Sequence, residues 1–142
     1  MRVLLDLNVL FDFLLIRAPW YAEALALWEA NRAGTIEAHA ATFSIPTIFY
    51  VMRKQTDLAR AQKAVDDCLG SLTILAVDRR SLEYARAFAG PDFEDNLQIA
   101  CAVEAGLDAI VTRDPRGFSN SRIPAFTPAD LLARLGTSPP GP

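Results

Sequence analysis

Short apolar runs alternate along the chain with stretches in which apolar residues recur at helical spacing. Continuous apolar runs predict buried strands, and recurrence every three to four residues predicts helices. The runs indicate strands over 3–5, 35–42, 72–75 and 109–111, with a short extended piece over 123–126. The helical stretches cover 9–15, 20–34, 44–55, 57–69, 78–88, 92–105 and 128–135. We expect Ser44 to cap the third helix and Gly70 to close the fourth.

Regular alternation of strands and helices is typical of an α/β fold in which helices cover both faces of a parallel sheet. No internal repeat and no interdomain linker interrupt residues 1–136, so we predict a single domain there. Residues 137–142 contain only Ser, Pro, Gly and Thr after the last helix, and we expect this tail to be disordered.

The composition indicates a globular protein that does not enter membranes. The chain is 51% hydrophobic and 22% charged, with no apolar run of the roughly 20 residues that a span needs and no signal-peptide pattern. Cys68 and Cys101 show no metal-binding spacing, so we expect reduced, buried thiols in a cytoplasmic protein. His39 is the single histidine, which argues against a histidine metal site or a catalytic triad and favours a structural or surface role.

Acidic residues stand where the predicted elements meet. Asp6 ends the first strand, Asp92, Glu94 and Asp95 open a helix, and Asp114 follows the fourth strand. The carboxyl ends of parallel strands and the amino ends of the helices after them lie on one edge of the sheet, where ligands bind. We therefore expect these acids to converge, although the outer two are over 100 residues apart in sequence.

Each acid also has an ordinary structural explanation. Asp6 could cap the first helix, and Asp114 before Pro115 is a common turn residue. Asp92 suits a helix N-cap, with Asp95 three residues later in capping-box spacing, so metal binding and capping both stay open for Asp95. We place Asp12, more than one turn into the first helix, on a solvated face.

Taken together, carboxylates without His or Cys partners suit hard cations such as Mg²⁺ or Mn²⁺. One or two such ions activate water and stabilise a leaving oxygen in phosphodiester hydrolysis. The formal net charge is −3, which argues weakly against nucleic-acid binding. Without the four acids Asp6, Asp92, Asp95 and Asp114 it would be −3 + 4 = +1, so charge neither supports nor excludes an RNA substrate.

Four segments resemble the PIN domain family, and most of all its bacterial VapC-like branch. They are DLNVL at 6–10, FEDNLQIACAVEAG at 93–106, IVTRDPRGF at 110–118 and FTPADLL at 126–132. The resemblance runs from Arg2 to Leu135 in the family's order. It implies a three-layer α/β/α fold with a central parallel sheet of four or five strands. It also implies a metal-dependent endoribonuclease that acts as the toxin of a type II toxin–antitoxin pair, with an antitoxin partner and a homodimer.

The family's site residues carry over by position. The resemblance implies Asp6, Asp95 and Asp114 as catalytic, metal-binding acids, with Asp92 as a further metal ligand. Asn8, Thr112 and Glu94 would lie next to these acids and orient them without binding the metal themselves.

One departure from the family pattern concerns a glutamate that most members carry in the helix after the second strand. The corresponding stretch FSIPTIFYVMRK, 43–54, contains no acid, and Ser44 and Thr47 are its small polar residues. Either Asp92 or Glu94 replaces the missing carboxylate, metal affinity is weaker, or the domain is inactive. The last possibility gives an alternative function, a catalytically inactive PIN-like scaffold that binds RNA or protein.

Basic residues near the acids are candidates for binding RNA phosphates without reading sequence. Arg113 and Arg116 flank Asp114, whereas Arg53 and Lys54 are equally well explained as solvated charges. A third function, phosphotransfer with Asp6 as nucleophile, fits less well. Dehalogenase-type phosphatases need an aspartate two residues later, where this chain has Asn8, and no suitably placed lysine follows the later strands.

Overall fold

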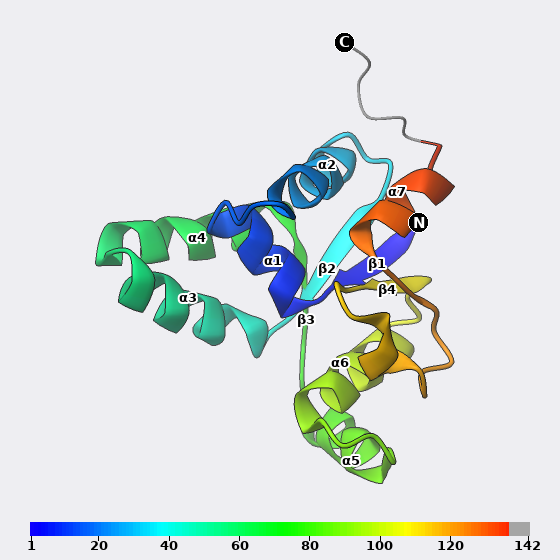
Figure 1. The fold of residues 1–142 in the computed structure, drawn as a ribbon. Coiled ribbons are helices and arrows are strands. Elements are labelled where there is room, and N and C mark those ends of the chain that lie inside the picture. The colour runs from blue at the N-terminus through cyan, green and yellow to red at the C-terminus, as the bar shows by residue number, and fades with distance from the viewer. Residues whose placement is uncertain (137–142) are drawn as a thin grey trace.

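The computed structural model describes residues 1–136 and contains a five-stranded, all-parallel sheet in the order β3-β2-β1-β4-β5 (Figure 1). The tail, 137–142, lies outside the described residues. β1 is central because it pairs with β2 on one side and β4 on the other. The strands are β1 (Arg2–Leu5), β2 (Glu37–Ala41), β3 (Thr73–Leu75), β4 (Ala109–Val111) and β5 (Ala125–Phe126).

Seven α-helices and one 3₁₀ turn, η1, connect the strands within the described range. The predicted helices all exist, with ends that differ by a few residues. They are α1 (Leu7–Leu14), α2 (Tyr21–Arg32), α3 (Ser44–Gln55), α4 (Leu58–Ser71), α5 (Arg79–Ala87), α6 (Phe93–Glu104), η1 (Pro115–Phe118) and α7 (Pro128–Arg134).

Side chains that alternate along β1 divide the core into two faces. Val3 and Leu5 pack with residues of α1, α2, α3, α4 and α7, whereas Leu4 packs with Ile99 of α6 on the opposite face. α5 lies outside α6 and contacts it through Ala85 and Leu97. The fold therefore has three layers, helix, sheet and helix, as the sequence predicted (Figure 1).

Acidic or hydroxyl N-caps begin four helices, whose starts lie within one residue of the predicted ones. Asp57, Asp78, Asp92 and Thr127 each accept a backbone hydrogen bond three residues on. The prediction that Ser44 caps α3 is wrong, because Ser44 is the first residue of the helix and Phe43 precedes it without a side-chain cap.

The prediction that Gly70 closes α4 is also wrong. The helix continues through Gly70 to Ser71, and the amide of Leu72 still bonds to the carbonyl of Cys68. Glycine can end a helix by adopting a positive φ, and that happens instead at Gly34 and Gly106, which follow α2 and α6.

The predicted burial of individual residues is correct for the two cysteines and wrong for Asp12. Cys68 and Cys101 are free and buried, as expected. His39 is structural, since it is fully buried on β2 and its Nε2 lies 3.1 Å from a carboxylate oxygen of Glu37. The placement of Asp12 on a solvated face is wrong, because the residue is 1% exposed. Within the described residues, no helix has the length and apolar character to cross a membrane.

Candidate active site at the carboxyl edge of the sheet

Asp6 stands directly beyond the central strand, at the point where the order of strands reverses. β1 leads to β2 on one side, while its other neighbour is β4, and in open α/β sheets ligands bind at such a reversal. The amide of Asp6 donates to the carbonyl of Val111 at 2.9 Å, which extends the β1–β4 pairing by one residue. Sheet pairing thus fixes the position of this carboxylate.

Three donors hold the carboxylate of Asp6. Oδ1 accepts from the amide of Leu7 at 2.7 Å and from Nε2 of Gln98 at 3.1 Å. Oδ2 accepts from the hydroxyl of Thr112 at 2.8 Å. Asp6 is 8% exposed, and burial raises its pKa above the ordinary value although the hydrogen bonds from Thr112 and Leu7 oppose the rise. Asp6 therefore does cap α1, but it also connects β1, β4 and α6.

The turn after β4 is tied to this carboxylate. Oγ1 of Thr112, which donates to Asp6, accepts from the amide of Asp114 at 3.2 Å. Asn8 accepts from the amide of Arg113 through Oδ1 at 3.4 Å, so it contacts the turn rather than Asp6. The structure brings residues 6, 8, 112 and 114 together across more than 100 positions of sequence.

The acids at the start of α6 face the same edge. Asp92 caps the helix by accepting from the amide of Asp95 at 3.1 Å. Asp95 has its pKa raised to about 6, first by burial and then by the negative charges of Asp92 and Asp6. Glu94 and Asp114 add smaller contributions of the same sign. Burial and the charges of Asp92 and Asp6 also raise the pKa of Glu94.

A close approach of the backbone places Asp95 beside the turn after β4. A Cβ atom added to Gly117 would lie 2.7 Å from Oδ2 of Asp95, so only glycine fits there without movement. Within residues 1–136, no donor lies at hydrogen-bond distance from the Asp95 side chain. This carboxylate therefore sits among like charges with no compensating partner, which is costly unless it protonates or meets a cation.

Asp114 is exposed, as Asp92 and Glu94 are, and an arginine side chain binds it. Nε of Arg116 donates to Oδ1 at 2.9 Å, and this contact is the main reason that the pKa of Asp114 lies below its ordinary value. Arg113, the other candidate for binding RNA, turns inward. Its Nε lies 2.9 Å from Oδ2 of Asp12, and its guanidinium stacks 4.0 Å from the ring centre of Trp20.

The donor chemistry of this edge suits a hard divalent cation, since all the acidic side chains present oxygen and repel one another. However, among residues 1–136 no three His, Cys, Asp or Glu side chains are arranged so that they could hold one ion as they stand. The acids are neighbours rather than a formed coordination shell. A cation bound by Asp114 would have to replace the guanidinium of Arg116.

Two residues of the site were missed by the sequence reasoning. Gln98 is 1% exposed, and its Oε1 has no hydrogen-bond partner within the described residues. Its position one helical turn after Asp95, on the same face of α6, could have indicated it. Asp12 pairs with Arg113 across about 100 residues of sequence, and nothing local in the sequence signals that contact.

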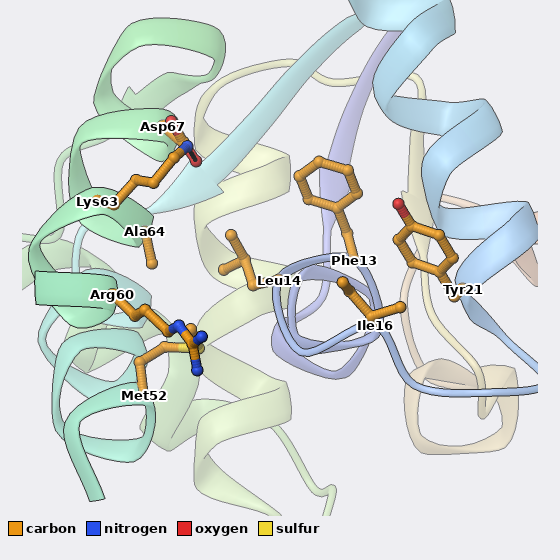
Figure 2. A pocket seen from close by; sticks show the side chains of 9 residues that line it. All are labelled: Phe13, Leu14, Ile16, Tyr21, Met52, Arg60, Lys63, Ala64 and Asp67. Carbon is orange, nitrogen blue, oxygen red and sulfur yellow. Dashed lines mark hydrogen bonds and ion pairs between the residues drawn. The ribbon is translucent and has the colours of Figure 1, made fainter. Parts of the chain in front are cut away.

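A separate concavity lies away from the acids, between α1 and the α3–α4 pair (Figure 2). It has a volume of about 250 Å³. Apolar side chains such as Leu14 and Met52 form its walls, and charged groups of α4 stand at its rim. Figure 2 shows Lys63 paired with Asp67 there, at 2.8 Å. None of the predicted acids lines it. The lining residues are Phe13, Leu14, Ile16, Tyr21, Met52, Arg60, Lys63, Ala64 and Asp67.

Comparison with protein families identifies the PIN domain. The model of the PIN domain matches residues 2–116, which span the sheet edge described above and every acid placed at it. A search of curated proteins gives no significant match to the chain.

Several solved structures share the fold at low sequence identity. VapBC from Salmonella typhimurium, solved bound to DNA, is 17% identical with a TM-score of 0.69, over 90% of this chain and 98% of that one. VapBC2 from Rickettsia felis, bound to a promoter DNA fragment, is 15% identical with a TM-score of 0.66, over 89% and 98%. Mycobacterium tuberculosis VapC20, a toxin that cleaves the sarcin–ricin loop, is 11% identical with a TM-score of 0.67, over 82% and 93%.

Proposed function

The chain belongs to the PIN domain family, and from this premise we propose that it is a metal-dependent endoribonuclease, the toxin of a type II toxin–antitoxin pair. The observation that carries the proposal is the hydrogen bond between Thr112 and Asp6. It joins the ends of β1 and β4 at the reversal of strand order, beside the acids that open α6. The Asp6 carboxylate caps the start of α1, and the added bonds from Gln98 and Thr112 orient it toward the sheet edge, beyond what capping alone requires.

The residues that would hold Mg²⁺ or Mn²⁺ are Asp6, Asp95, Asp114 and Asp92. The ion would supply water activation and neutralise charge on the phosphate. Thr112 and Gln98 orient the Asp6 carboxylate, and Asp95 contributes the charge that is least compensated in the free protein. Arg116, 91% exposed at its side chain, is available to meet an RNA phosphate once it leaves Asp114.

A protein partner is part of this proposal. A structure of similar fold from Klebsiella pneumoniae is a toxin–antitoxin complex by name, and we propose a cognate antitoxin for this chain. The cavity between α1 and α4 offers apolar walls with a charged rim, which suits a peptide with alternating apolar and charged residues (Figure 2). We also propose that the protein forms a homodimer and acts in the cytoplasm.

Cleavage of RNA by the purified protein tests the activity. The wild type and Asp6→Asn are each incubated with total RNA and Mn²⁺, with and without EDTA. The proposal expects cleavage by the wild type only, abolished by EDTA. Cleavage by the aspartate variant at the wild-type rate would show that the activity comes from a contaminant.

A catalytically inactive scaffold remains the second candidate, and two observations favour it. The helix α3 carries no acid in its sequence, and in the part of the chain that the structure describes no three acids are arranged for one ion. Calorimetric titration with Mn²⁺ separates the two functions. Binding that Asp6→Asn and Asp95→Asn both weaken supports the nuclease, whereas no binding at millimolar Mn²⁺ supports the scaffold.

A further inference from the structure

Arg113 connects three elements through its side chain. Its Nε lies 2.9 Å from Oδ2 of Asp12 on α1, with the arginine side chain 27% exposed and that of the aspartate 1% exposed. The Trp20 ring, at the entry to α2, covers the guanidinium with its centre 4.0 Å from Cζ. The guanidinium is thus held between a buried carboxylate on one side and an aromatic face on the other.

The backbone of Arg113 lies between two residues of the proposed site. Thr112 before it donates to Asp6, and Asp114 after it donates its amide to Thr112. The amide of Arg113 itself is directed at Oδ1 of Asn8. A rotation of this one residue would therefore displace both the hydroxyl and the exposed acid.

We propose that Arg113 is a positioning residue, which Asp12 and Trp20 hold so that the turn after β4 presents Thr112 and Asp114 to Asp6. The inference rests on the proposed nuclease function for its kinetic consequences. It replaces the expectation that Arg113 binds an RNA phosphate. Nε of the guanidinium is paired with a buried carboxylate and one face is stacked on a ring, so moving it to a phosphate would leave Asp12 charged and unpaired.

The buried carboxylate of Asp12 requires a positively charged partner, and Arg113 provides it. Oδ1 of Asp12 has no hydrogen-bond partner within residues 1–136, and Nε of Arg113, although it lies 2.9 Å from Oδ2, makes no aligned hydrogen bond there. The attraction between the two opposite charges is therefore what compensates the buried carboxylate. Arg17, in the segment that follows α1, contributes a weaker favourable charge. A neutral residue at position 12 would remove the reason for Arg113 to point inward.

Amide hydrogen exchange tests the proposal without any need for activity. In the wild type, the amide of Asp114 bonds to the hydroxyl of Thr112. We expect Asp12→Asn to speed its exchange by about tenfold or more, while amides within α5 keep their rates. Arg79→Gln, which breaks an exposed ion pair with Glu83 on α5, is the matched control and should leave the Asp114 amide unchanged. Equal exchange of this amide in wild type and Asp12→Asn overturns the proposal.

Kinetics with an RNA oligonucleotide and Mn²⁺ distinguish positioning from phosphate binding. We expect Asp12→Asn and Arg113→Gln each to lower kcat roughly ten- to hundredfold, with KM within about threefold of wild type. The double variant should be no worse than the poorer single variant. Arg113→Lys, which keeps the charge, should recover part of kcat.

Other outcomes would contradict either the positioning role of Arg113 or the nuclease function. If Arg113→Gln raises KM and flattens its dependence on salt while Asp12→Asn leaves both unchanged, the guanidinium binds phosphate and the proposal is wrong. If the wild type shows no cleavage, the nuclease function fails, and the exchange rate of the Asp114 amide still decides whether Asp12 and Arg113 position the turn. Should Asp12→Asn not fold, Trp20→Leu, which uncovers the guanidinium but leaves its charge paired, gives the same exchange test.

Discussion

Asp95→Asn should stabilise the metal-free protein, although it removes a residue proposed to be essential. Burial and four neighbouring carboxylates raise the pKa of Asp95 from 3.8 to about 6. A rise of that size corresponds to about 3 kcal/mol of unfavourable free energy for the charged form. Because the side chain is only half-buried, solvent screening reduces the expected gain to about 1–2 kcal/mol, or about 4–8 °C in Tm.

The direction of the Asp95 pKa shift determines at which pH Asp95→Asn should be more stable than the wild type. The folded chain holds the Asp95 proton more tightly than the unfolded chain, since the folded pKa is the higher one. The contribution of that proton to stability is therefore present at pH 3.8 and below, and it is lost as pH rises toward about 6. The two proteins should be equally stable near pH 4, and Asp95→Asn should be the more stable one above about pH 6.

Thermal unfolding in EDTA at pH 8 and at pH 4 measures the difference, with Asp130→Asn on α7 as an exposed control. Addition of Mn²⁺ should reverse the order at pH 8, because only the wild type keeps the ligand and gains stability from the bound ion. If Asp95→Asn is less stable than wild type at pH 8 in EDTA, the Asp95 carboxylate has a favourable partner, and the prediction that its charge destabilises the metal-free protein is wrong.

Four further predictions follow from single residues. Thr112→Val removes a donor to the Asp6 carboxylate and should lower kcat roughly tenfold or more in the RNA assay. Arg116→Gln frees the Asp114 carboxylate and should tighten Mn²⁺ binding severalfold by calorimetry. Leu27→Ala opens a cavity under a fully buried side chain and should cost about 2–5 kcal/mol in urea unfolding. Burial lowers the pKa of His39, so the wild type should lose stability as pH falls through about 6.5, and His39→Leu should lose less.

The fold was predictable because its signals are local. Uninterrupted apolar runs such as Val3 to Leu5 identify buried parallel strands, and helical spacing placed helix starts within a residue of where Asp57, Asp78 and Thr127 cap them in the structure. The errors at Ser44 and Gly70 have the same origin. A cap residue shows its type in the sequence, but whether the backbone takes the cap conformation is decided by what the helix packs against.

Prediction of the site was limited by contacts between distant segments. The sheet edge could be inferred from strand ends, and it does gather Asp6, Thr112 and Asp95. The burial of Asp12 could not, since its cause is a guanidinium about 100 residues later. Arg113 was interpreted as a phosphate-binding residue from its place beside Asp114, but its direction depends on the Trp20 ring and the Asp12 carboxylate.

The central claim is that the acids at the carboxyl edge of the sheet jointly bind a divalent cation. Anomalous diffraction from a crystal grown with Mn²⁺ tests it most directly, because the ion is located without reference to activity. We expect a manganese peak within coordination distance of carboxylate oxygens from Asp6 and Asp95, with the Arg116 guanidinium moved away from Asp114. A fully occupied peak elsewhere on the protein, with none at this edge, would contradict it.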